Sequence, residues 1–115
     1  MAQLNKTKVT SVTTTGYAIA NIDTTDVYDI SALDRALVIG APTGTPYEGQ
    51  ALVFRIRDNG VKPGFPLAFN SIFVSRGVPF PIATMPGCVI RIAFLYSSEV
   101  PTWDLISVAQ EAYKG

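Results

Sequence analysis

The sequence has no histidine and only one cysteine among its 115 residues. Without an imidazole group, the chain cannot build a Ser-His-Asp triad or a histidine-ligated zinc site. The lone thiol, Cys88, excludes an internal disulfide and a cysteine-only metal site. Its place on the apolar side of an alternating stretch is typical of a small core residue. The commonest kinds of nucleophilic and metal-dependent catalytic site are therefore excluded.

Charged residues are also scarce, at 16% of the chain against a typical ~25%. Nine basic and nine acidic residues give zero net charge, so no overall field attracts nucleic acid. No apolar run approaches the ~20 residues of a transmembrane helix, and the beginning, MAQLNKTKVTS, lacks the apolar core of a signal peptide. We therefore expect no nucleic-acid or membrane partner, and synthesis in the cytoplasm.

Long segments, such as 65–74 and 78–90, contain no charge at all. Small all-β monomers usually protect their sheet edges with lysine, other charges and proline. Two explanations fit: neighbouring subunits cover part of the surface, or the protein is a monomer with a Ser/Thr/Asn-rich surface. We favour assembly, because large uncharged patches usually mark interaction sites.

The clearest pattern is alternation with a period of two residues. In residues 50–60, QALVFRIRDNG, the side chains of Leu52, Phe54 and Ile56 fall on one face of an extended strand. The stretch 88–96, CVIRIAFLY, repeats the pattern. Two long strands, each with an apolar face, need each other or another sheet to cover that face.

The rest of the chain predicts further short strands between turns rich in Gly, Pro, Asn and Asp. A different signal occurs at Ser31–Asp34, which resembles the start of a helical turn with Ser31 as its N-cap. Residues 40–49 read as a long loop, because their glycines and prolines cannot extend a sheet. The expected strands outside the two central ones are 8–15, 17–22, 27–30, 35–39, 65–70, 72–75, 78–84 and 102–109.

The regular succession of short strands and turns predicts an all-β fold of about eight to ten short strands, in a β-sandwich, jelly roll or barrel. No helical period is long enough to cross strands over in parallel, so we expect antiparallel pairing. Residues 1–15 are expected to form an N-terminal arm and an edge strand, and residues 16–115 a single β-sandwich domain. The segment 8–15 either joins that sheet at its edge or becomes ordered only against a partner.

No pattern of acids marks an active or metal site. Asp23, Asp26 and Asp29 are spaced by three residues, whereas a calcium loop places ligands at every second position. Paired carboxylates of a hydrolase meet only in space, and nothing in the sequence pairs the remaining acids. We therefore predict that the protein is not an enzyme and has no catalytic, cofactor-binding or metal-binding residues. A small hydrolase with cryptic paired acids is the counter-hypothesis.

Two groups of side chains are candidates for binding. If the strands pair, one sheet face is lined by Arg55, Arg57 and Arg91. These arginines then either bind an acidic partner or are ordinary solvated residues. Most aromatic residues occupy inward positions and are expected in the core. Tyr47, in the long loop, is the candidate for an exposed stacking platform.

Several short motifs occur in order along the chain: Pro42-Thr43-Gly44-Thr45-Pro46, Gly49-Gln50, Arg55-Ile56, Asp58-Asn59-Gly60, Tyr96, Trp103-Asp104 and Val108-Ala109-Gln110-Glu111. In these motifs the sequence resembles a β-domain of tailed-bacteriophage virion proteins, which occurs in tail-associated proteins and in small free-standing ones. The chain departs from that family at Phe69-Asn70, where the family has Trp-Asn, and in the proline-rich stretch Pro79–Thr84.

The resemblance implies a head decoration (cement) protein that binds the outer surface of the capsid and stabilises it. Such a protein is made in the host cytoplasm, is located on the capsid surface of the virion, and has the major capsid protein and its own copies, as a homotrimer, for partners. An N-terminal segment that adds a strand to another chain is expected to hold it there. The interface residues that we predict are Leu4, Lys6, Lys8, Val9, Val12 and Tyr47.

Two other readings stay open. The protein is a tail, baseplate or tail-fibre component that binds a host glycan, with Tyr47 and the loop 40–49 at its tip. Otherwise it is a β-sandwich interaction module outside viruses. Fold alone does not decide among these roles.

Overall fold

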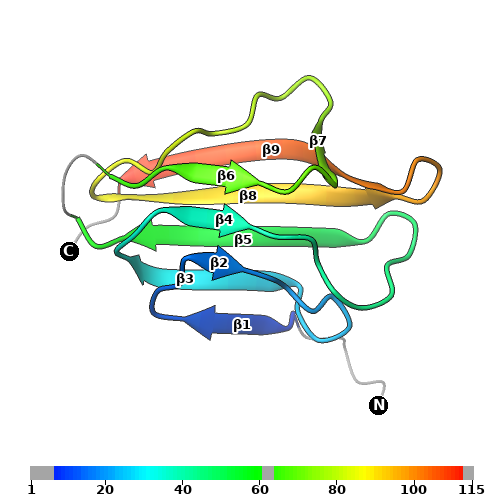
Figure 1. The fold of residues 1–115 in the computed structure, drawn as a ribbon, viewed down its shortest axis with the longest axis horizontal. Helices are drawn as coiled ribbons and strands as arrows, with labels where there is room; N and C mark the ends of the chain where they lie inside the picture. The colour runs from blue at the N-terminus through cyan, green and yellow to red at the C-terminus, as the bar shows by residue number, and fades with distance from the viewer. Residues whose placement is uncertain (1–6, 61–63, 113–115) are drawn as a thin grey trace, which may run out of the picture.

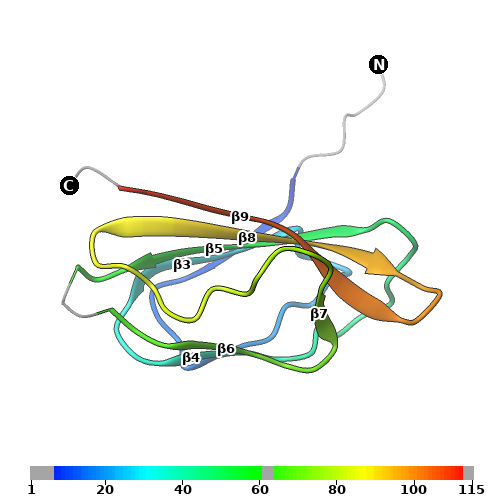
Figure 2. The same ribbon diagram turned by 90° about the horizontal axis from the view of Figure 1, so that it is seen from above.

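The computed structural model describes residues 7–60 and 64–112, which form strands and loops and contain no helix. Two facing sheets make up two layers (Figures 1 and 2). The larger sheet has six strands in the order β1-β3-β5-β8-β9-β7, and the smaller has the order β2-β4-β6. The strands are β1 (Val9–Val12), β2 (Tyr17–Ala18), β3 (Val27–Leu33), β4 (Leu37–Ile39), β5 (Ala51–Asp58), β6 (Leu67–Phe69), β7 (Phe73–Ser75), β8 (Cys88–Ser97) and β9 (Thr102–Ala112).

From β1 to β6 the chain alternates between the two sheets, with odd-numbered strands in the larger and even-numbered strands in the smaller. Successive strands of each sheet then run parallel: β1 with β3, β3 with β5, β2 with β4, and β4 with β6. The predicted all-antiparallel pairing is therefore wrong. Parallel neighbours need a crossover, and here a strand of the opposite sheet provides it in place of a helix. The all-β class is confirmed, with mixed sheets.

The two long strands found in the sequence do pair with each other. β5 lies antiparallel to β8, and β8 forms an antiparallel hairpin with β9, as expected. Phe54 lies opposite Ile92, and both are fully buried, whereas the next residue, Arg55, lies opposite Arg91. The alternation of the sequence therefore fixes one face toward the core and the other toward solvent.

The core lies between the two sheets and is rich in aromatic side chains. Phe54, Phe94 and Trp103 are fully buried, and the ring of Phe94 packs 4.6 Å from that of Phe73 and 6.0 Å from that of Phe54, centroid to centroid. Each buried side chain of this size contributes about 1.5–3 kcal/mol relative to exposure. This shared core holds both sheets, and with them both outer faces, in place.

The helical turn predicted at Ser31–Asp34 is wrong, because β3 continues to Leu33. The misleading signal is Ser31 with Asp34 three residues later, the pattern of a capping box. In the structure the Ser31 hydroxyl instead donates to the Val12 carbonyl oxygen of β1 at 3.5 Å. A β-bulge between Ile30 and Leu33 shifts the register with β5, and both of these side chains are fully buried.

Two other segments are less regular than predicted. Residues 78–84 form no strand; one bridge, between Pro66 and Ala83, ties this segment to the chain before β6. Pro79 and Pro81 lack the backbone N–H that a longer ladder needs.

The segment 8–15 supplies β1, which occupies the edge of the larger sheet and pairs with β3. Of the two alternatives for that segment, the structure has the edge strand.

Candidate interaction surfaces

The predicted interface residues lie in two separate parts of the molecule. Leu4 and Lys6 fall outside the described residues. Lys8 and Val9 lie at the start of the edge strand, where the Lys8 Nζ donates to the carbonyl oxygen of Asp23 at 3.2 Å and Val9 is half exposed. The two other predicted residues differ in exposure: Val12 packs against the core, whereas Tyr47, in the loop before β5, is 66% exposed.

An apolar surface covers the outside of the smaller sheet. Tyr17, Val38 and Ala68 form one row across β2, β4 and β6, and all three are exposed. These strands contain no charged residue. Ile19 is exposed beside the row. We call these four residues the apolar face. Sequence alternation does not reveal this surface, because its three strands are only two or three residues long.

Gly40 leaves room for two side chains of the apolar face. A Cβ added at Gly40 would lie 2.9 Å from the Cζ of Tyr17 and 3.1 Å from the Cγ1 of Ile19. The missing side chain therefore leaves the space into which these two side chains pack. The Tyr17 ring thus lies close to the backbone of Gly40, while the residue stays 55% exposed to a partner.

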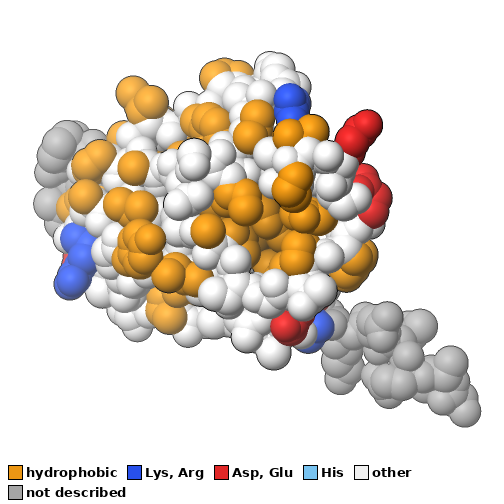
Figure 3. All heavy atoms as spheres, turned by 45° about the vertical axis from the view of Figure 1, so that its right-hand side comes forward, with side chains coloured by type: hydrophobic (Ala, Val, Ile, Leu, Met, Phe, Trp, Pro, Cys, Tyr) orange, Lys and Arg blue, Asp and Glu red, His pale blue; other side chains and the backbone are white. Residues whose placement is uncertain are grey.

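Figure 3 looks obliquely at the side of the smaller sheet. Hydrophobic side chains gather across the middle of this view, and the Lys, Arg, Asp and Glu side chains that it shows lie near its margins. A contiguous uncharged region with a charged border resembles the core and rim of protein–protein interfaces. The distribution is therefore suited to a protein partner.

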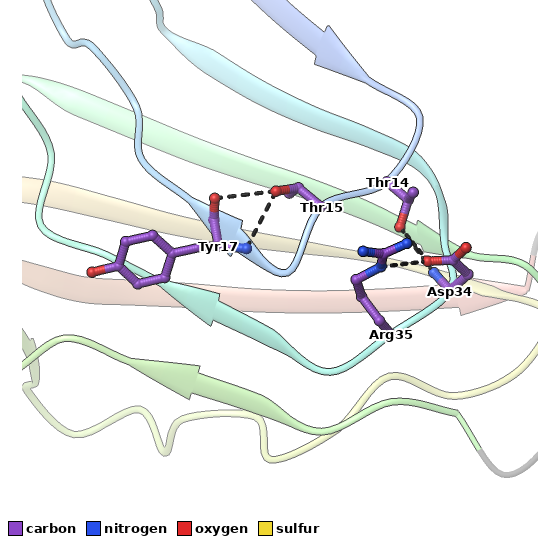
Figure 4. Close-up of polar contacts among 5 residues, drawn as sticks. All are labelled: Thr14, Thr15, Tyr17, Asp34 and Arg35. Carbon is purple, nitrogen blue, oxygen red and sulfur yellow. Dashed lines mark hydrogen bonds and ion pairs between the residues drawn. The ribbon is translucent and has the colours of Figure 1, made fainter.

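Polar contacts fix one margin of the apolar face (Figure 4). The Oδ1 of Asp34 accepts hydrogen bonds from the Thr14 hydroxyl at 2.7 Å and from the Arg35 Nε at 2.8 Å. Next to them, Thr15 Oγ1 accepts a hydrogen bond from the Tyr17 N–H at 3.2 Å. The bonds from Arg35 and Thr14 lower the pKa of Asp34. The turn before β2 is thereby attached to the turn before β4.

A second fixed element is the loop that carries Tyr47. The Oε1 of Glu48 accepts hydrogen bonds from the backbone N–H of Ser98 at 2.8 Å and from its hydroxyl at 2.6 Å. The Gly49 N–H donates to the Tyr96 carbonyl at 2.9 Å. The hydrogen bonds from Ser98 also lower the pKa of Glu48. Tyr47 is therefore presented on a loop that is attached to the β8–β9 turn.

The outside of the larger sheet carries a row of charged side chains, beside exposed apolar side chains such as Val9 and Leu95. Arg55 and Arg91 are cross-strand neighbours, as one reading of the sequence required. Together with Arg57 they line a shallow hollow of about 200 Å³ on this face. The Nε of Arg55 donates to the Oδ1 of Asp29 at 2.7 Å. The larger sheet thus presents a charged row on its outside, whereas the strands of the smaller sheet contain no charge.

In ranges 7–60 and 64–112, no three His, Cys, Asp or Glu side chains come together as a metal site. The same ranges contain no helix long and apolar enough to cross a bilayer. Asp23 and Asp26 instead accept hydrogen bonds from the backbone N–H groups of Thr45 and Lys8. These contacts join segments that are 22 and 18 residues apart in the sequence.

No protein-family model matches the chain, and comparisons with curated proteins and with solved structures find no match. The resemblance to a phage virion domain therefore stays a prediction from the motifs of the sequence. The assignment of a role depends on those motifs and on the surfaces described above.

Proposed function

We propose that this protein is a structural component of a bacteriophage virion, a capsid decoration protein that binds the outer surface of the head and stabilises it. The observation that supports binding is the apolar face, Tyr17, Ile19, Val38 and Ala68, on strands without charge. Exposed uncharged patches of this kind usually mark protein interfaces. The sequence motifs supply the phage context, with the major capsid protein as the partner.

The two-layer body suits such a role. We infer that the two sheets act as one β-sandwich, because they share an aromatic core that includes Phe54, Phe73 and Phe94. A rigid body loses little conformational entropy when it attaches. As a homotrimer it would present three copies of each contact, which raises the overall affinity through effective concentration.

The N-terminal segment, residues 1–15, is the second proposed contact. Its ordered part, β1, occupies the edge of the larger sheet and pairs there with β3. A chain that leads into an edge strand can add a strand to a neighbouring protein. Removal of residues 1–7 is expected to leave the domain folded and to weaken capsid attachment; unchanged occupancy on particles would refute this contact.

A pair of matched substitutions tests the main proposal. Val38 and Leu95 are exposed to nearly the same extent, 38% and 37%, and both lie on strands with outward side chains. They lie on different sheets. Val38→Glu places a charge within the apolar face, whereas Leu95→Glu places the same charge on the opposite sheet.

The readout is the number of copies bound to heads purified without this protein, measured by co-sedimentation. We expect Val38→Glu to lower occupancy severely and Leu95→Glu to leave it close to that of the unsubstituted chain. Circular dichroism and urea unfolding of both variants show whether they are folded. Equal occupancy for the two folded variants, or no binding of the unsubstituted chain to heads, would refute the proposal.

One observation favours a second candidate, a tail or baseplate component that binds a host glycan. Tyr47 is 66% exposed on a loop that the Glu48–Ser98 contact holds in place. A fixed aromatic ring can stack on a sugar. If this candidate is correct, the isolated protein labels glycans on an array and Tyr47→Ala removes the signal.

A further inference from the structure

A cationic hollow lies on the outer face of the larger sheet, away from the apolar face. Three of the six Lys and Arg residues in ranges 7–60 and 64–112 line it, although the whole chain has no net charge. Its volume, about 200 Å³, has room for several water molecules at ~30 Å³ each. The residues that line it are Asp29, Ser31, Arg55, Arg57, Val89 and Arg91, and we call it the arginine hollow.

The sheet register brings its charges together. Asp29 on β3, Arg55 on β5 and Arg91 on β8 are successive neighbours in one row across three strands. Like charges directly opposite each other on neighbouring strands destabilise a sheet. The Arg55–Arg91 pair therefore has a repulsive cost that a bound anion would remove.

The first arginine of the row is oriented by its neighbours. The Nε of Arg55 donates to one oxygen of Asp29 at 2.7 Å, and the other oxygen of Asp29 accepts from the Ser11 hydroxyl at 2.9 Å. Asp29 is well covered, with 17% of its side chain exposed. Since this contact uses one of the five N–H groups of a guanidinium, Arg55 is held in position with further donors.

The second arginine is held only weakly. The Nη1 of Arg91 lies 3.8 Å from the Oε2 of Glu111, an ion pair too long for a hydrogen bond. Both side chains are largely exposed, at 43% and 68%. Glu111 is therefore a weak competitor for any stronger anion that reaches Arg91.

We propose that the arginine hollow binds a carboxylate side chain from an acidic segment of a partner protein. Arginine forks match the planar geometry of carboxylates with paired hydrogen bonds. Asp29, within the hollow, disfavours a dianion such as phosphate more than a single negative charge. Nucleic acid would need a track of basic residues along the surface, and the arginines here occupy one spot.

This site does not depend on the proposed attachment through the apolar face. The hollow lies on the larger sheet, and the apolar face on the outside of the smaller one. A substitution in one therefore leaves the other intact. Failure of carboxylate binding would not alter the expected result for Val38→Glu, and the reverse also holds.

The test measures binding of a short, terminally blocked oligoglutamate peptide to the full chain at low ionic strength, by fluorescence anisotropy. Arg91→Gln is expected to weaken binding about tenfold, the loss typical of one charge-assisted contact. Arg76→Gln is the matched control, because Arg76 is also an exposed, ion-paired arginine but does not line the hollow. Arg76→Gln makes the same change in net charge as Arg91→Gln and should leave the affinity for the peptide almost unaltered.

A second variant has the opposite expected effect. Glu111→Gln removes the weak competitor beside Arg91 and should tighten peptide binding about two- to threefold. A purely structural role for the ion pair would not produce that gain. The proposal is overturned by equal effects of Arg91→Gln and Arg76→Gln, by no binding of the oligoglutamate, or by equal binding of an oligoglutamine. Tighter binding of inorganic phosphate or of a single-stranded oligonucleotide would overturn it too.

Discussion

One row of outward side chains on each sheet shows a contrast in chemistry between the two outer faces. On the larger sheet one outward row includes Asp29, Arg55 and Arg91, which are neighbours on adjacent strands. On the smaller sheet the corresponding row is Tyr17, Val38 and Ala68. Exposure of the apolar row to water costs free energy, whereas the cost in the polar row is the repulsion between Arg55 and Arg91. We infer that the two faces serve different contacts.

The largest expected effect comes from removing the core that both faces share. Phe94→Ala deletes a fully buried ring that packs against Phe54 and Phe73, and should lower the free energy of unfolding by about 3–5 kcal/mol. Leu95→Ala is the control on the same strand, with its side chain on the outer face. Urea unfolding should separate the two variants clearly. Equal losses would contradict the assigned register of β8.

A glycine substitution should disturb the smaller sheet and not the larger one. Gly64 has φ +96°, and an added Cβ would overlap the carbonyl oxygen of Thr84. Gly64→Ala should therefore lower stability by about 2 kcal/mol or more. Gly87→Ala, at φ +77° with open space around the new Cβ, should have only the conformational cost of about 1 kcal/mol.

Hydrogen exchange locates the damage from Gly64→Ala. The N–H of Leu67, which donates to the carbonyl of Ile82 at 2.9 Å, should exchange faster in that variant. Amides in the β8–β9 hairpin should keep their protection. Loss of protection in the hairpin, with β6 unaffected, would contradict the assignment of the damage to the smaller sheet.

The polar face should matter less for folding. Asp29→Asn weakens the contact with Arg55, and because the arginine is 40% exposed we expect a loss of less than about 1 kcal/mol. Salt should reduce the difference between the variant and the unsubstituted chain, since it screens exposed pairs. A salt-independent loss comparable to that of Phe94→Ala would mean that the outer row is part of the folding core.

The smallest expected effect is a change with pH at the loop of Tyr47. The hydrogen bonds from Ser98 lower the pKa of Glu48 below its ordinary value of 4.5. Because the folded pKa is depressed, the contact is fully present above pH 4.5 and is lost as the pH falls through the lower, folded value. The NMR shift of the Ser98 amide should therefore titrate below pH 4.5, and Glu48→Gln should abolish that titration. A midpoint at or above 4.5 would contradict the contact.

The parts of the fold that the sequence predicts well are its long strands. In β5 and β8, alternation extends over eight and ten residues, and it correctly indicates the buried face. The pairing of the two strands, which makes Arg55 and Arg91 neighbours, is one of the alternatives that this pattern leaves open. The hairpin of β8 with β9 is also predicted correctly. Local pattern suffices where a strand is long enough to repeat it.

The parallel pairing could not be predicted in the same way. β2, β4 and β6 are two or three residues long, so nothing in the sequence shows that they form a second sheet and serve as crossovers. For the same reason the apolar face was missed, because its residues come from three different strands. Such a surface exists only after the chain has folded, whereas the exposure of Tyr47 follows from its place in a loop.

Chemical footprinting of Tyr17 tests the contrast between the faces most directly. The Tyr17 ring is 55% exposed on the apolar face, and Leu95, 37% exposed on the other sheet, is an internal reference in the same chain. We would measure hydroxyl-radical oxidation of both side chains in the isolated protein and in assembled phage heads. The account predicts that assembly strongly reduces oxidation of Tyr17 relative to Leu95. Unchanged oxidation of Tyr17 in particles that carry the protein would contradict it.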